Sequence, residues 1–123
     1  MSAVQLMETI ATKLSLYSYQ CADEVKFHRG ISKALLMHGI AFEHEVKASP
    51  TDRFDFLVSS SVVIEAKIKG TLSDVLRQIN RYCQLPQVEG VIVAAVRNWG
   101  RSDFPRELSG KPIRLVRLSN QAF

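Results

Sequence analysis

The chain is poor in the features that mark secreted, membrane-spanning and zinc-binding proteins. Its 123 residues include 2 cysteines, 4 prolines and 6 glycines. Cys21 and Cys83 stand apart, without CxxC or CxxH spacing, so we expect neither a zinc site nor a disulfide framework. No apolar run approaches the length that spans a bilayer, and the N-terminus lacks the apolar core of a signal peptide. We therefore expect an intracellular, cytoplasmic protein that does not enter a membrane.

Repeats, low-complexity tracts and linker-like stretches are missing as well. Hydrophobic residues make up 46% of the chain, which excludes a disordered protein and suits one domain with a real core. We predict a single domain over residues 1–123, in which residues 1–20 form an N-terminal helical extension. The formal net charge of +4 is compatible with a polyanionic partner but is not specific for one.

Hydrophobic periodicity predicts an α/β domain with the element order α-α-β-β-β-α-β-β. The predicted elements are, in chain order, residues 4–16, 22–37 and 41–48, the two arms of a hairpin between 52 and 70, a helix capped by Thr71, and strands near 88–96 and 113–118. The run from Val88 to Val96 is almost continuously apolar, which is typical of a strand covered on both faces. In the polar loop that follows, Trp99 either closes an edge of the core or stacks on an unpaired base beside Arg97 and Arg101.

The hairpin is the most informative part of the chain. Its two arms meet at three serines, and Phe54, Phe56 and Val58 alternate with Asp55 on the first arm. If the register is centred on Ser60, Asp55 lies directly opposite a residue of the second arm, at a Cβ separation of roughly 4.5–5.5 Å. That residue is also acidic.

The opposed acid is Glu65, and Lys67 follows it on the same strand face. Two carboxylates so close repel each other unless a positive group lies between them. A hard divalent cation such as Mg²⁺ has the required affinity for carboxylate oxygens. The pattern therefore predicts a site for a metal ion and a water molecule at Asp55, Glu65 and Lys67.

The spacing of these three residues, D-x(9)-E-x-K, resembles the motif of the PD-(D/E)XK nuclease superfamily. Phe54 stands where the motif has proline, and the resemblance extends over residues 23–96. It implies a restriction-endonuclease-like core, in which helices flank a central mixed β-sheet. It also implies a Mg²⁺- or Mn²⁺-dependent endonuclease that hydrolyses phosphodiester bonds in DNA. Small phage nucleases and Holliday-junction resolvases are the members of similar size, so branched or junction DNA is a candidate substrate and a host cytoplasm a candidate location.

The resemblance also implies roles for individual residues. Asp55, Glu65 and the carbonyl of Ala66 would hold the cation, while Lys67 would orient the attacking water or stabilise charge on the phosphate. The ordinary alternative is an exposed strand face on which Lys67 pairs with Asp55.

Two helical residues would complete the site. Glu24 would add an acid from the first turn of its helix, where the helix dipole alone would also stabilise it. Gln78, four residues before Tyr82 in a Q-x-x-x-Y pattern, would contact the water or the phosphate, although a glutamine is ordinary on any helix.

Basic residues around the proposed site are candidates for phosphate binding. They are Arg53, Lys69, Arg77 and Arg81. A two-stranded substrate favours a homodimer, in which each core would engage one strand. Two alternatives remain open: a catalytically inactive nucleic-acid-binding module, or an assembly module, on the same fold. The three histidines of the chain have no ligand spacing and are expected to be packed or exposed residues.

Overall fold

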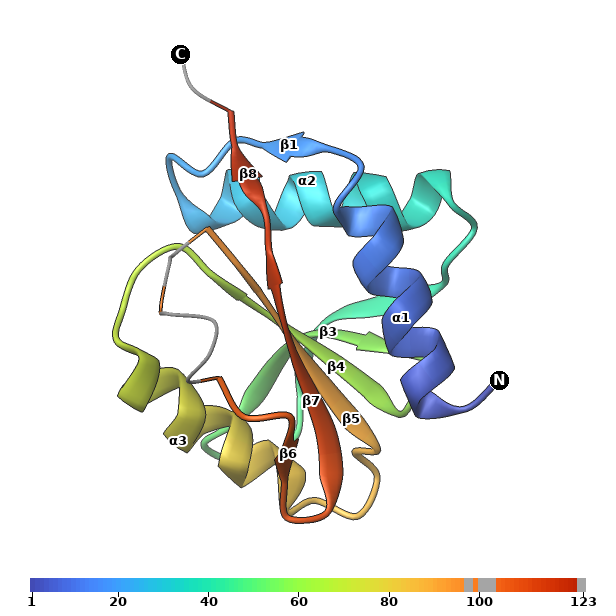
Figure 1. The fold of residues 1–123 in the computed structure, drawn as a ribbon, viewed down its shortest axis with the longest axis vertical. Helices are drawn as coiled ribbons and strands as arrows, with labels where there is room; N and C mark the ends of the chain where they lie inside the picture. Colours follow the sequence, from blue (N-terminus) through green and yellow to red (C-terminus); the bar gives the residue numbers. More distant parts are fainter. Residues whose placement is uncertain (97–98, 100–103, 122–123) are drawn as a thin grey trace.

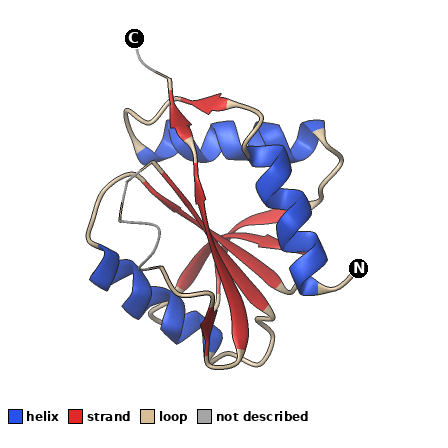
Figure 2. Ribbon diagram, viewed as in Figure 1, coloured by secondary structure: helices blue, strands red, loops and turns tan. Residues whose placement is uncertain are grey.

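The computed structural model describes residues 1–96, 99 and 104–121. Within these residues, helices flank a six-stranded mixed sheet, which confirms the predicted α/β class (Figures 1 and 2). The elements are, in chain order, α1 (Ala3–Leu14), β1 (Ser18–Tyr19), α2 (Glu24–Met37), β2 (Phe42–Lys47), β3 (Arg53–Val58), β4 (Val62–Lys67), α3 (Leu72–Cys83), β5 (Gly90–Ala95), β6 (Glu107–Leu108), β7 (Lys111–Arg117) and β8 (Ser119–Asn120).

The longer elements follow one another in the predicted order. The predicted order lacks β1, β6 and β8, each of which has two residues. Strands so short carry no alternation that a pattern could detect. β1 pairs in parallel with β8, and β6 pairs in antiparallel fashion with β7, so both pairings depend on where longer elements bring the chain.

In the described part of the chain, the main sheet has the strand order β2-β3-β4-β5-β7-β6. β2, β3 and β4 are antiparallel neighbours, whereas β4, β5 and β7 are parallel. A parallel pair needs a crossover, and α3 supplies it between β4 and β5. Every residue of β5 is buried, as the continuous apolar run predicted.

The helices cover both faces of this sheet (Figure 1). α1 and α2 pack on one face, where Phe27, Ile31 and Leu35 are buried. α3 packs on the other face through a core that includes Ile79 and Tyr82. α1 also contributes to the first core, through Met7, Ile10, Ala11 and Leu14.

Local signals set the beginnings of the helices. Asp23 caps α2 by accepting a hydrogen bond from the N–H of Lys26. Thr71 caps α3 in the same way, through the N–H of Asp74, as predicted. Because Asp23 is the N-cap, Glu24 is the first residue of α2, and this local capping interaction fixes its position in the first turn.

The described part of residues 97–110 contains Trp99, whose indole N–H lies 3.3 Å from the carbonyl oxygen of Gly70. Its side chain packs against the core on the α3 side of the sheet, which supports the prediction that it closes a core edge. Arg97 and Arg101, its predicted partners in base stacking, lie outside the described residues. Among the helices that the structure describes, none has both the length and the apolar character needed to cross a membrane.

Candidate active site

The β3–β4 hairpin has the predicted register. Phe56 pairs with Ile64, and Val58 with Val62, so the hairpin is centred on Ser60. One more step along this register places Asp55 opposite Glu65. Regular pairing stops before that step, and the side chain of Asp55 instead accepts a hydrogen bond of 2.8 Å from the backbone N–H of Ala66.

The alternation along β3 is interrupted at Asp55, contrary to the prediction that Phe54, Phe56 and Val58 share one face. Phe54 packs on the α3 side, against Tyr82, whereas Phe56 packs on the side of α1 and α2. The neighbouring strand is irregular at the same level, since Glu45 has a φ of 55° and does not join the ladder between β2 and β3. A left-handed residue breaks the regular pleat, so the faces exchange here. Asp55 sits at the point of exchange.

Both acids are buried, which excludes the alternative of an exposed strand face. Asp55 retains 8% of its exposure and Glu65 retains 3%. Asp55 lies toward α2, where His28 approaches it. Glu65 alternates along β4 with Ile64 and Ala66, which pack on the side of α1 and α2, so its side chain lies on the side of α3. The site therefore sits between helices of the two layers.

The pKa values of both carboxyls are raised. Burial raises the pKa of Glu65 to about 8, and the charge of Asp55 adds to the rise, while Lys67 opposes it. Burial also raises the pKa of Asp55, with a further contribution from Glu24, against the lowering effects of the Ala66 N–H, His28 and Lys67. Each acid is thus held in surroundings that disfavour its charge.

Lys67 lies beside Glu65 rather than Asp55. Its Nζ is 3.5 Å from Oε2 of Glu65, and its side chain keeps 26% of its exposure. The ammonium group is therefore placed between the buried acid and solvent. At this position the ammonium group of Lys67 can contact a ligand that approaches from solvent.

Two open clefts lie near the hairpin, and Asp55 lines the second of them. The first, of about 630 Å³, lies between the N-terminus of α2 and the end of β4, and its lining includes Glu24, Lys67 and Lys69. The second, of about 390 Å³, lies between α2 and the strands β2 and β3, and its lining includes Glu24 and Asp55. Glu24 borders both clefts, so the structure brings this predicted residue to the site.

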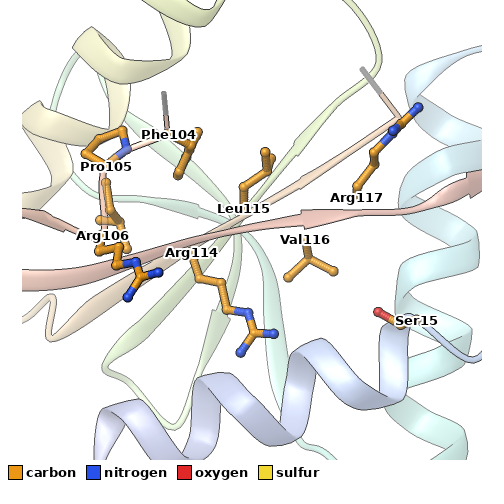
Figure 3. A pocket seen from close by; sticks show the side chains of 9 residues that line it. Ser15, Phe104, Pro105, Arg106, Arg114, Leu115, Val116 and Arg117 are labelled. Atoms are coloured by element: carbon orange, nitrogen blue, oxygen red, sulfur yellow. The ribbon is translucent and has the colours of Figure 1, made fainter. Parts of the chain in front are cut away.

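A further cavity of about 300 Å³ lies elsewhere, over β7 (Figure 3). Arg106, Arg114 and Arg117 line it, and Arg114 points toward α1, where it pairs with Glu8. The lining contains neither predicted acid. The cavity is therefore lined by basic side chains, and the charge of one of them, Arg114, is offset by Glu8 of α1.

Gln78 hydrogen-bonds to a residue of its own helix. Its side-chain amide donates a 3.0 Å hydrogen bond to the hydroxyl of Tyr82, which in turn donates one of 3.0 Å to the carbonyl of Arg53. The Q-x-x-x-Y pattern therefore produces an internal pair on α3. A direct contact of Gln78 with water or phosphate stays a prediction.

Most of the predicted phosphate-binding residues already have acidic partners. Arg53 lies 3.1 Å from Glu45, and Arg81 lies 3.1 Å from Asp52. Arg77 pairs with Asp74 on its own helix. These partners offset their charge, whereas Lys69 lines the first cleft beside Lys67.

The structure adds two residues that the sequence analysis did not assign to the site. Nδ1 of His28 is 2.9 Å from Nε2 of His44, and Nε2 of His28 is 3.7 Å from Oδ2 of Asp55. The signal was weak but present, since His28 follows Glu24 by one helical turn and so shares its face. His44 is 16 residues from its partner, and pairing over that distance leaves no local pattern.

The carboxylates fit a hard cation in one respect that the structure shows directly. Among the described residues, Oε1 of Glu65 is buried and has no hydrogen-bond partner. A divalent cation would provide that partner and stabilise both acids in the charged form. The described residues contain no group of three His, Cys, Asp or Glu side chains placed to hold a metal ion, so backbone and solvent oxygens would complete the coordination of a cation bound by the two acids.

Comparisons of the chain with protein-family models, with curated proteins and with solved structures find no match. Assignment of a function therefore depends on the residues of the site and their surroundings.

Proposed function

We propose that the protein is a Mg²⁺- or Mn²⁺-dependent endonuclease that hydrolyses phosphodiester bonds in DNA. The observation that carries this proposal is the buried pair Asp55 and Glu65, with Lys67 beside Glu65, one open cleft lined by Lys67 and a second lined by Asp55. Burial of two acids, of which one raises the pKa of the other, is unfavourable for folding, so a function that uses their charge is the simplest reason for the arrangement. The antiparallel hairpin followed by a helical crossover into a buried parallel strand supports a restriction-endonuclease-like core.

Each residue has a defined part in the proposed reaction. Asp55 and Glu65 would hold the cation, together with the carbonyl of Ala66. When bound, the cation would lower the pKa of a water molecule and neutralise charge on the phosphate. Lys67 would orient the nucleophile or stabilise the negative charge that builds on the phosphate. Glu24, whose charge already acts on Asp55, would bind a water at the edge of the two clefts.

DNA would be held mainly through its phosphates. Lys69 lines the cleft beside the acids, and Arg53 and Arg81 lie near the start of β3. Contacts of this kind carry little sequence information, so we expect binding that depends on salt and on DNA shape. Two copies of the chain, each acting on one strand, would favour branched DNA over plain duplex.

The test is cleavage of plasmid, linear duplex, single-stranded and four-way-junction DNA by the purified protein with Mg²⁺ or Mn²⁺. We expect metal-dependent cleavage that leaves 5′-phosphate and 3′-hydroxyl ends. Glu65→Gln should abolish it, whereas Glu43→Gln, at an exposed position of β2, should not. Salt-dependent DNA binding without cleavage by the wild-type protein would indicate an inactive binding module. Neither binding nor cleavage would indicate an assembly module.

A further inference from the structure

We infer that a groove beside α2 binds the phosphate backbone of DNA and carries one strand away from the cleft at Asp55. The inference rests on the proposed DNA substrate and adds the surface that would hold the DNA next to the acids. The groove has a volume of about 290 Å³ and lies between α2 and the small sheet of β1 and β8 (Figure 1). Its basic lining residues, here called the α2 stripe, are Lys26, Arg29 and Lys33.

The α2 stripe follows a single face of the helix. Its members are spaced by three and four residues, which brings side chains of a helix next to one another. All three are exposed, whereas Phe27 and Ile31 on the neighbouring face are buried in the core. At 1.5 Å per residue the stripe extends over roughly 10 Å, about the length of three nucleotides of one strand at 3.4 Å each.

The charge of the α2 stripe is not offset within the part of the protein that the structure describes. None of its three side chains forms an ion pair there, and the described lining of the groove contains no acid. Arg53 and Arg81, by contrast, each have a carboxylate partner. A phosphate that enters the groove therefore does not compete with an acidic side chain for these cations.

The floor of the groove is fixed by packing. A Cβ at Gly30 would stand 3.0 Å from Cδ2 of Tyr19, so the glycine allows β1 to lie this close to α2. The hydroxyl of Tyr19 donates a hydrogen bond of 2.6 Å to the carbonyl of Leu14, and its own carbonyl accepts one of 2.7 Å from the N–H of Gln121. The groove is therefore formed before a ligand binds, which limits the entropic cost of binding.

Arg29 connects the groove to the proposed active site. It lines the groove and also the cleft of about 390 Å³ that Asp55 lines. A strand bound at Asp55 would therefore continue over Arg29 into the groove. The basic cavity over β7 offers no such connection, because neither predicted acid lines it and its Arg114 pairs with Glu8.

Amide NMR of the wild-type protein, titrated with a short DNA duplex in the presence of a chelator, tests the surface directly. The chelator prevents metal-dependent cleavage during the measurement. We expect the amide signals of residues 26–33 and of Gln121 to shift, and those of Arg106 and Arg114 to stay in place. Shifts confined to the cavity over β7 would overturn the inference, and this measurement needs no variant.

The salt dependence of DNA binding provides the second readout. In a variant that combines Lys26→Gln, Arg29→Gln and Lys33→Gln, the slope of log binding constant against log salt concentration should become shallower by about two to three. Each phosphate contact on duplex DNA contributes about 0.9 to that slope. Fluorescence anisotropy of a labelled duplex at several salt concentrations measures it. Because the three side chains are exposed, the variant should fold as wild type does.

The matched control loses three positive charges from the cavity over β7 instead. It combines Arg106→Gln, Arg114→Gln and Arg117→Gln, and its slope should change by less than about one. Equal changes in the two variants would show that DNA responds only to net charge, which would overturn the inference and leave the endonuclease proposal standing. Binding along the α2 stripe without cleavage would overturn the endonuclease proposal alone, and no DNA binding by the wild-type protein would overturn both.

Discussion

The two ends of the β3–β4 hairpin are equally buried but chemically opposite. At the turn, Val58, Val62 and Ile64 contribute only apolar surface to the core. At the open end, Asp55 and Glu65 place two carboxylates at a comparable depth. The first arrangement stabilises the fold through the removal of apolar surface from water, whereas the second opposes folding because the charged form is desolvated.

The difference indicates how the hairpin combines stability with a reactive site. The turn end holds the register, and the register then determines which residues meet at the open end. The acids therefore do not need to stabilise their own positions. Variants at either end should separate the two contributions.

The largest effect on stability is expected at the turn end. Ile64→Ala should lower the free energy of unfolding by about 2–5 kcal/mol, because it removes a fully buried side chain and leaves a cavity. Urea denaturation followed by circular dichroism measures the change. Leu36→Ala is the matched control, since Leu36 is 67% exposed and its loss should change stability by less than about 0.5 kcal/mol. Similar losses of unfolding free energy in Ile64→Ala and Leu36→Ala would contradict the proposal that the turn end of the hairpin stabilises the fold.

The largest effect on activity is expected at the open end. Lys67→Ala should reduce turnover by about 10²-fold or more, equivalent to about 2.7 kcal/mol of transition-state stabilisation, while DNA affinity hardly changes. Lys69→Ala, two residues along the chain, should weaken DNA binding and leave the chemical step intact. Single-turnover cleavage together with binding titrations separates these effects. If Lys67→Ala cleaves at the wild-type rate, Lys67 is only a surface charge.

The stability of the metal-free protein should depend on pH through Glu65. Its carboxyl has an ordinary pKa of 4.5 and a pKa of about 8 in the folded protein. A raised pKa favours the protonated form in the folded state, so its stabilising contribution is complete below pH 4.5 and is lost as the pH rises through about 8. Glu65→Gln should remove this loss and be more stable than wild type at pH 9, by about 1–4 kcal/mol.

Urea midpoints between pH 4 and pH 9, for wild type and Glu65→Gln, measure this dependence. Saturating Mn²⁺ should reduce the loss in wild type, because a bound cation stabilises the charged carboxylate. Parallel pH profiles of the two proteins would show that Glu65 titrates normally.

The smallest effect is expected in the turn itself. Ser59 and Ser60 have φ angles of 53° and 57°, a region that is unfavourable for residues other than glycine. Ser60→Gly should raise the free energy of unfolding by about 0.5–1 kcal/mol and leave cleavage unchanged. Ser61→Gly should not stabilise the protein, because Ser61 does not have a positive φ. Thermal unfolding of both variants provides the comparison, and equal shifts would show that the turn is not strained.

The site illustrates which of its parts a sequence can reveal. The position of Asp55 opposite Glu65 could be predicted from the sequence, because serines at the turn and alternating apolar residues specify the register of a hairpin within a few residues. The apparent alternation failed at Asp55, where the conformation of Glu45, on a different strand, changes the pleat. His44 was missed because it has no local pattern that distinguishes it from a packed histidine, and the one signal of His28, its spacing of one helical turn from Glu24, was too weak to do so.

The sequence by itself determined the beginning of α3 at Thr71, the register about Ser60 and the burial of β5. Each depends on interactions between near neighbours in the chain, or on a continuous run of apolar residues. The tertiary structure alone decided that His28 lies beside Asp55 and that Arg81 pairs with Asp52. Those contacts require α2 and α3 to be packed on the sheet, and side-chain partners across a packed interface depend on the position of whole elements rather than on local preference.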